Sequence, residues 1–292
     1  MKIIEFGKHT YNAPDKFSEL TLQQLMAVAE AVAAHKPLAD GKLYIASKWF
    51  PEAYQTLSKY LKSDKEQALK LVPGAIERFE ETNKDLNALA QMCGWVNSDK
   101  THVTSNWLVS EITINGTTYL GPSNKLSNLE FWEYCKADTH FGRYQRTNSL
   151  AEFAKFLACI YRVANRDLAQ VEQTGNARIP FNDKRIITDS AKFMHVDAST
   201  RVAVTINYIA IKHWLKRVFT EVFRSASKGD ENGNDTNQDI GRMYGRLLLN
   251  IAKRRHQDEE IIARKPLLLV LEDQNDEMER VREYNEQIKN LR

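Results

Sequence analysis

The stretch "SNLEFWEYCKADTHFGRYQRTNSLAEFAKFLACIYR", residues 127–162, decides the fold of this chain. Ser127 is followed at helical spacing by Glu130, and Ser149 by Glu152, so each pair fits a capping box that begins a helix. The turn between the two predicted helices is short, and a connection of that kind makes helices antiparallel neighbours. The sequence therefore predicts a packed helical pair within a larger helical core.

Asp138 lies inside the apolar face that is predicted for the first of these helices. The residues of this face recur at helical spacing and are Phe131, Tyr134, Cys135, Asp138, Phe141 and Gly142. A carboxylate in such a face is costly unless a cation pairs with it. If both helices are regular, Arg162 lies about 6 Å from Asp138 along the axis, at about 1.5 Å per residue. We therefore predict a structural ion pair between Asp138 and Arg162, which Arg143 could share.

The regions around this pair are also predicted to be helical, so the expected fold class is mainly α, a multi-helical and bundle-like body. Thr21 and Gln24 fit a capping box that opens an early helix. In "EITINGTTYL", Asn115-Gly116 separates two alternating segments, which predicts one small β-hairpin at about 110–120, packed on the helices. The expected divisions are an N-terminal helical region (1–96), a hairpin insertion (97–126), a central helical core (127–224), a flexible linker (225–238) and C-terminal helices (239–292).

Some helix boundaries and one pair of glycines are also predicted. The segments at about 52–61 and 64–71 read as separate helices, whereas residues 199–224 read as one uninterrupted helix. Gly241 and Gly245 are spaced so that they would allow another helix to approach closely.

The charge and hydropathy of the chain narrow the classes of function. Lys and Arg total 41 and Asp and Glu total 38, and the net charge of +3 is far below the surplus expected of a protein that mainly neutralises phosphates. No apolar run approaches the roughly 20 residues that span a bilayer, and the N-terminus lacks the continuous apolar region of a signal peptide. We therefore expect residence in a cytoplasm, without membrane association.

The candidate catalytic and metal-binding residues form no recognised motif. Asp138 and His140 are so spaced on a predicted helix that their side chains diverge by about 200 degrees. His195 and Asp197 would share a face of an extended segment, but Asp197 also suits a helix cap. A metal site would need further ligands, and the sequence contains no HExxH or CxxC. We expect no catalytic residue, no metal and no cofactor.

The remaining motif searches give similar results. No GxxxxGK[ST], GxGxxG or GxSxG occurs, so nucleotide binding and the hydrolase elbow have no local support. Cys93, Cys135 and Cys159 are odd in number and widely spaced, which predicts buried free thiols.

Basic residues on two predicted helices could form a patch for nucleic acid or for an acidic partner. They are Lys212, Lys216, Arg217, Arg224, Lys253, Arg254 and Arg255. The acidic stretch "QDEE", residues 257–260, follows closely, and Lys or Arg late in a helix is favourable to the helix dipole in any case. We therefore interpret these basic residues mainly as solvent-exposed helix faces, and a binding patch is the alternative.

Several stretches occur in the same order as in a known group of proteins. They are "FSELTLQQLMAVAEAV" (17–32), "LEFWEYCKADTHFGRY" (129–144), "SLAEFAKFLACIYR" (149–162), "GRMYGRLLLNIAK" (241–253) and "KPLLLVLEDQNDEMER" (265–280). In this order the chain resembles a loosely defined group of tail-region and tail-assembly proteins of phages and prophages. Those proteins begin with an "sLTL.Q" helix, carry an "AD..f.RY…LYR" helical pair and close with a "VL..L"-type segment. The chain departs from the pattern at Ile160, where the group has Leu, and in the insertion at 225–238.

The resemblance implies a role in phage morphogenesis. The chain would be either a chaperone-like factor that holds tail proteins during assembly or a structural component of the virion, in the tail or connector region. Its partners would be other phage structural or tail proteins, or further copies of itself. It would act in the host cytoplasm during assembly, and a structural component would then be incorporated in the virion. The group offers no catalytic residues, so an enzymatic activity is not expected.

Two alternatives from other classes of function make different structural demands. A helical DNA-associated protein would need the basic residues of 212–224 and 252–256 to converge on one face. A metal-dependent hydrolase would need His140, His195 or His213 to meet carboxylates in one cleft.

Overall fold

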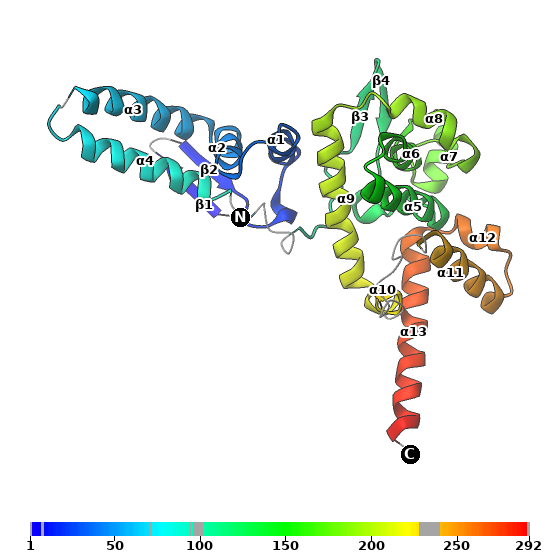
Figure 1. Ribbon diagram of the computed structural model, residues 1–292. Coiled ribbons are helices and arrows are strands. Elements are labelled where there is room, and N and C mark those ends of the chain that lie inside the picture. Colours follow the sequence, from blue (N-terminus) through cyan, green and yellow to red (C-terminus); the bar gives the residue numbers. More distant parts are fainter. Residues whose placement is uncertain are drawn as a thin grey trace. The chain divides into compact units, whose positions relative to one another are not determined.

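The computed structural model describes residues 2–6, 9–70, 72–93, 95, 102–227 and 240–290. Most of its elements are helices, with a few short antiparallel strands, so the predicted mainly α fold class is confirmed (Figure 1). The chain divides into two compact units. Unit 1 comprises Met1–Thr104 and Asp197–Ala210, and unit 2 comprises Ser105–Val196 and Ile211–Arg292.

Unit 1 combines a strand pair with helices. Its elements are β1 (Lys2–Phe6), β2 (His9–Ala13), α1 (Leu22–Ala33), α2 (Leu38–Trp49), α3 (Pro51–Leu69), α4 (Ala75–Gln91) and the part of α9 (Ala198–Val218) up to Ala210. The Thr21 hydroxyl accepts a hydrogen bond from the Gln24 amide, and the Gln24 side chain accepts one from the Thr21 amide, which confirms the predicted capping box. The predicted break between 61 and 64 is wrong, because α3 is continuous there and the stretch contains neither Gly nor Pro.

Aromatic side chains hold the elements of unit 1 together. The indole Nε1 of Trp49 donates a hydrogen bond to the Gln24 carbonyl oxygen at 3.2 Å, which ties α2 to α1. The Tyr11 hydroxyl on β2 donates to Glu52 at 2.9 Å, which ties the strand pair to α3. Each ring therefore contributes both buried apolar area and a satisfied polar group.

Unit 2 contains a small antiparallel sheet in the order β3-β4-β5, formed by β3 (Glu111–Ile114), β4 (Thr117–Leu120) and β5 (Arg162–Val163). β3 and β4 confirm the predicted hairpin, and both turn residues have positive φ, 49° at Asn115 and 77° at Gly116. Positive φ at both positions is what a type I′ turn requires, and it explains the Asn-Gly pair. The third strand was not predicted, because it has only two residues and directly follows a helix.

Gly121, just after β4, marks a place where only a glycine fits. A Cβ atom at this position would lie 2.8 Å from Trp107 Nε1 and 2.8 Å from Tyr161 Cε1. Both rings are buried, and Trp107 Nε1 and the Tyr161 hydroxyl donate hydrogen bonds to the same acceptor, the Val109 carbonyl oxygen, at 2.7 and 2.6 Å. The rings are therefore held in place and have little freedom to move aside.

Several helices of unit 2 pack around a central helix, α5 (Phe131–Thr147). The other helices of this unit are α6 (Leu150–Ile160), α7 (Leu168–Thr174), α8 (Ile186–Phe193), the end of α9, α10 (Thr220–Ser227), α11 (Ile240–Arg255), α12 (Glu259–Arg264) and α13 (Leu267–Asn290). α5 packs against α6, α11, α12 and α13, and it corresponds to the first helix of the predicted pair. The turn to α6 is made by Asn148 in the left-handed conformation, with φ of 51°.

The caps of this helical pair differ from the predicted ones. α5 begins one turn later than expected, and its capping box is formed by Glu130 and Glu133 rather than by Ser127 and Glu130. Ser149 is the N-cap residue of α6, but its side chain makes no capping hydrogen bond. The sequence rule favours serine at a cap, but here the Glu133 side chain accepts a hydrogen bond from the Glu130 amide at 3.3 Å.

The predicted long helix and linker also require correction. The helix is interrupted at Phe219, between α9 and α10, and α9 contributes to both units. Residues 225–227 of the predicted linker belong to α10, and 228–238 lie outside the described residues. Nothing lies within 4 Å of a Cβ atom added at Gly245, so this glycine does not serve close helix packing. The surroundings of Gly241 lie outside what the structure describes.

Candidate functional site

The most deeply buried charges of unit 2 form a cluster at the start of α5. The Glu133 side chain is fully buried, and its Oε1 lies 3.0 Å from Arg162 Nη1 and 3.1 Å from Arg178 Nη1. Arg178 also donates hydrogen bonds to the carbonyl oxygens of Ile160 at 2.8 Å and Asn128 at 2.9 Å. Two guanidinium groups therefore share one carboxylate.

The predicted pair between Asp138 and Arg162 is thus replaced by a pair between Glu133 and Arg162. The prediction assumed a regular helix through residue 162, but α6 ends at Ile160 and Arg162 lies in β5. Its side chain therefore leaves from extended backbone and reaches the first turn of α5. Arg143 does not share Asp138 either, because its guanidinium is half-exposed and lies 4.0 Å from Glu152.

Asp138 has partners from other helices. Its Oδ1 lies 2.6 Å from Lys212 Nζ on α9, and its Oδ2 accepts a hydrogen bond from the Tyr244 hydroxyl on α11 at 3.0 Å. Burial raises the pKa of the Tyr244 hydroxyl well above its usual value, and the Asp138 charge raises it further. Tyr244 therefore stays protonated and acts as a donor. The carboxylate joins α5, α9 and α11, and it does not line any of the pockets described below.

His140 meets a carboxylate, but in the seam between α5 and α6. Its Nδ1 lies 2.8 Å from Glu152 Oε2, and Lys155 Nζ lies 2.6 Å from the other oxygen of Glu152. Burial lowers the pKa of His140, although Glu152 opposes the shift. His140 packs the helical pair together and does not line any of the pockets described below.

The other predicted titratable residues are dispersed. Asp197 Oδ1 accepts a hydrogen bond from the Thr200 amide at 2.9 Å at the start of α9, as a cap residue would, while His195 is exposed. His213 is half-buried on α9. All three cysteines are buried free thiols, as predicted, and burial raises the pKa of Cys93 to about 12.

The predicted basic residues are partly neutralised by neighbouring acids. Lys212 is paired with Asp138, and Arg254 Nη2 lies 3.5 Å from Asp273 Oδ2 on α13. Arg255 contacts the same carboxylate. The remaining residues of the set whose side chains are described, Lys216, Arg217 and Lys253, are exposed and have no ion-pair partner in the described part of the chain. The Arg224 side chain lies outside that part.

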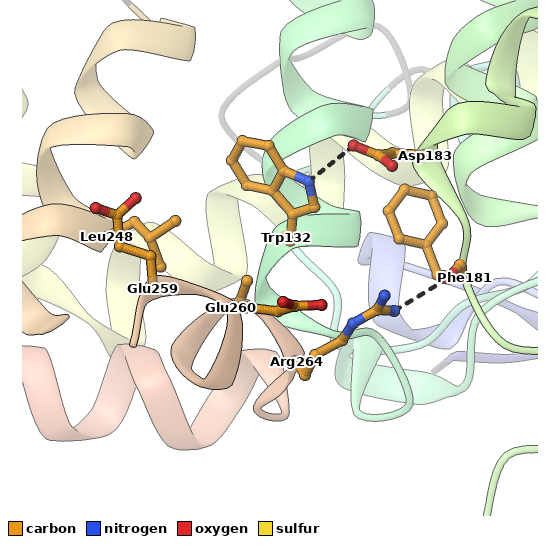
Figure 2. Close-up of a pocket in the computed structure, with 8 residues that line it drawn as sticks. Trp132, Phe181, Asp183, Leu248, Glu259, Glu260 and Arg264 are labelled. Carbon is orange, nitrogen blue, oxygen red and sulfur yellow. Dashed lines mark hydrogen bonds between the residues drawn. The ribbon is translucent and has the colours of Figure 1, made fainter. Parts of the chain in front are cut away.

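A pocket of about 250 Å³ in unit 2 combines an apolar floor with an acidic rim (Figure 2). Its apolar part consists of the Trp132 ring on α5, Phe181, Leu248 on α11 and Ala263 on α12. The charged part consists of Asp183, Glu259, Glu260 and Arg264. Sequence reasoning did not find this site, because its residues come from α5, the segment before α8, α11 and α12, and each is unremarkable in its own stretch.

The charges around the pocket leave an acidic surplus. Asp183 Oδ2 accepts a hydrogen bond from Trp132 Nε1 at 3.3 Å and lies 3.9 Å from Lys136 Nζ, so this acid is partly balanced. Arg264 lies 3.1 Å from Glu130 and donates to the Phe181 carbonyl oxygen at 3.1 Å. Glu259 and Glu260 are exposed and have no ion-pair partner among the residues that the structure describes.

The pocket has two neighbouring hollows. One of about 610 Å³ is lined by residues 179–185 together with Glu260 and Arg264, and one of about 430 Å³ includes Arg178, Pro180 and Arg264. Arg264 lines all three hollows, which therefore adjoin this residue in unit 2, and together we call them the Arg264 groove.

Comparison with protein families, curated proteins and solved structures gives no match. The described residues contain no group of three or more His, Cys, Asp or Glu side chains placed to hold a metal ion. Within the same residues, no helix is long and apolar enough to cross a membrane. The Arg264 groove, which includes the pocket of about 250 Å³ at Trp132 (the Trp132 pocket), is the candidate site.

Proposed function

We propose that this chain is a phage morphogenesis protein that acts by binding other proteins rather than by catalysis. The order of its sequence motifs, which resembles that of phage tail-region and tail-assembly proteins, supports the phage context. The Trp132 pocket supports the mode of action, since it offers an aromatic surface and charge but no paired nucleophile and base.

The pocket suits one basic side chain of a protein partner. A cation over an aromatic ring is attracted by the ring face, as Lys136 Nζ is at 4.6 Å from the centre of the Trp132 ring, and the attraction grows when water is excluded. The Glu259 and Glu260 carboxylates, which have no ion-pair partner among the described residues, would attract the same cation, while Leu248 and Ala263 would cover its aliphatic stem. An arginine in such a pocket is a common centre of binding energy in protein interfaces.

The proposal has two versions, which differ in the fate of the protein. A chaperone-like factor would bind tail proteins in the host cytoplasm and then leave, whereas a structural component would remain in the particle. Mass spectrometry of infected-cell lysates and of purified particles separates them. Presence in both supports the structural role, and presence only in lysates supports the chaperone role.

The pocket itself is tested by covalent capture. A photo-cross-linking amino acid at position 261, exposed beside Glu260, should capture a tail or other virion protein in an infected or induced cell, and one at exposed position 187 on α8 serves as the control. Glu259→Lys/Glu260→Lys should abolish the capture, because it reverses the rim charge. The matched variant Glu272→Lys/Glu283→Lys changes the net charge equally at exposed positions of α13 and should leave it intact. Equal capture by both variants would disprove a role for the pocket.

A further inference from the structure

The α3–α4 hairpin of unit 1 has almost no core along its outer half. The buried residues of α3 are Ala53 and Leu57, and those of α4 are Ala75, Leu86, Leu89 and Ala90. Between Leu57 and Leu86, Ala75 is thus the sole buried residue in the described part of the chain. Helices in proteins are stabilised mainly by burying an apolar face, so this segment lacks the usual source of stability.

Apolar side chains are exposed at the tip of the same hairpin. Leu69 is 76% exposed at the end of α3, Val72 is 39% exposed in the turn, and Ile76 is 55% exposed at the start of α4. Single exposed apolar residues need no explanation, but these three lie at one turn of the chain. Figure 1 shows α3 and α4 running side by side up to this turn.

Most exposed charges of the outer part of α3 are basic and most of those of α4 are acidic, apart from Glu66 on α3 and Arg78 and Lys84 on α4. The lysines of the outer part of α3 and its end are Lys59, Lys62, Lys65 and Lys70, whereas the acids of α4 are Glu77, Glu80, Glu81 and Asp85. All eight are exposed, and none of these lysines forms an ion pair within the described residues. The two helices are instead joined by Arg78 and Asp64, 3.7 Å apart in the seam. Within the described part of the hairpin, these lysines therefore do not pair with the acids of α4.

We propose that two copies of this chain associate through their hairpins, with α3 of one copy against α4 of the other. A twofold axis along the hairpins brings the two tips together and completes a four-helix bundle. The interface is self-complementary, because in each copy the outer part of α3 is mainly basic and α4 is mainly acidic. The lysines span about 16 Å of α3 and the acids about 12 Å of α4, at about 1.5 Å per residue, and both sets begin near the tip, so they match in height.

The proposed dimer accounts for both the sparse core of the hairpin and the exposed apolar residues at its tip. At the twofold axis, the exposed tip residues Leu69, Val72 and Ile76 of the two copies pack together and are shielded from water. The outer half of each hairpin also packs against the helices of the other copy. The charges then select the pairing of α3 with α4 over that of α3 with α3, because like charges would face each other in the second case.

The test is a charge exchange followed by sedimentation equilibrium. The unaltered protein should form dimers. Lys62→Glu/Lys65→Glu makes both helices acidic, and Glu77→Lys/Glu81→Lys makes both basic, so each variant alone should dissociate at least about tenfold more readily, a difference of about 1.4 kcal/mol. An equimolar mixture of the two variants should form the mixed dimer. The matched variant Lys253→Glu/Lys289→Glu, exposed in unit 2, should dimerise normally.

A disulfide trap gives a second and independent measurement. The native cysteines are all buried, so Val72→Cys supplies the one readily oxidised thiol at the tip among the described positions. Oxidation should give a covalent dimer, and the α3 charge reversal should suppress it. A protein that stays monomeric at all concentrations, a dimer indifferent to both reversals, or a tip that cross-links only to a different protein would overturn the proposal. Circular dichroism shows that each variant remains folded.

Discussion

Lys212 Nζ lies 2.6 Å from Asp138 Oδ1, and this contact joins α9 to the apolar face of α5. Replacing Lys212 by Met keeps the approximate length of the side chain and removes this cation from the buried Asp138 carboxylate, which retains the hydrogen bond from Tyr244. We expect the free energy of unfolding to fall by about 3 kcal/mol, as is typical when one partner of a buried pair is removed. Urea denaturation measures this, with Lys216→Met, exposed one turn later on α9, as the matched control. A loss as small as that of the control would show that the pair contributes nothing.

The Glu133 cluster predicts an order of stabilities. Glu133→Gln leaves two buried guanidinium groups without a counter-charge, so we expect a loss of about 3 to 5 kcal/mol. Arg162→Met should cost less, because it removes the surplus cation and leaves Arg178 paired with Glu133. Chemical denaturation at neutral pH compares the two variants. If Arg162→Met proves the more damaging, then the carboxylate is not the centre of the cluster.

His140 predicts a pH dependence. Burial lowers its pKa from the ordinary 6.5, although Glu152 opposes the shift, so the unfolded chain takes up the proton first as the pH falls. The contribution of His140 to stability is therefore complete above pH 6.5 and is lost as the pH falls towards the lowered pKa. Thermal denaturation between about pH 7.5 and 5.5 should show this slope, and His140→Gln should flatten it.

Glu152, the partner of His140, titrates in a separate window. Its pKa is lowered below 4.5: burial acts to raise it, and the hydrogen bonds from His140 and Lys155 outweigh that effect. Its stabilising contribution is thus lost only at more acidic pH. An unchanged slope in His140→Gln would assign the pH dependence to other groups.

Gly121 and Gly245 predict opposite responses to alanine. Gly121→Ala forces a Cβ atom against Trp107 and Tyr161, and overpacking of this kind costs about 1 to 3 kcal/mol. Gly245→Ala meets open space within α11 and should stabilise the protein by up to about 1 kcal/mol, because alanine favours a helix. Denaturation midpoints of the two variants decide this, and a stable Gly121→Ala protein would mean that the rings move aside.

Helical periodicity and turn chemistry were sufficient to predict the fold class, the Thr21 cap and the β3–β4 hairpin. These features depend on neighbours in the sequence. Arg162 shows where such reasoning ends, because a change from helix to strand within two residues redirects a long side chain to a different acid. Lys212 was noted for its charge, but its pairing with Asp138 depends on how α9 packs on α5, and local spacing does not encode that packing.

The candidate site was harder to predict for the same reason. Trp132, Phe181, Leu248 and Glu260 are distant in the sequence, and none belongs to a catalytic or metal-binding motif. The negative charge at the pocket rim depends on which charged residues are paired. Asp183 and Arg264 have hydrogen-bond or ion-pair partners, whereas Glu259 and Glu260 have no ion-pair partner among the described residues. Only the folded arrangement shows which acids remain unpaired.

The division of α9 between the two units has a consequence for synthesis on the ribosome. Unit 1 needs residues up to Ala210, although most of its chain precedes residue 105, and unit 2 needs segments on both sides of that return. Neither unit can be completed from one continuous stretch. At about 5 to 20 residues per second, the N-terminal helices wait several seconds for their last segment to emerge. During that interval, nascent unit 1 exposes the surface that α9 later covers, which makes it the stage most open to chaperone binding and to misfolding.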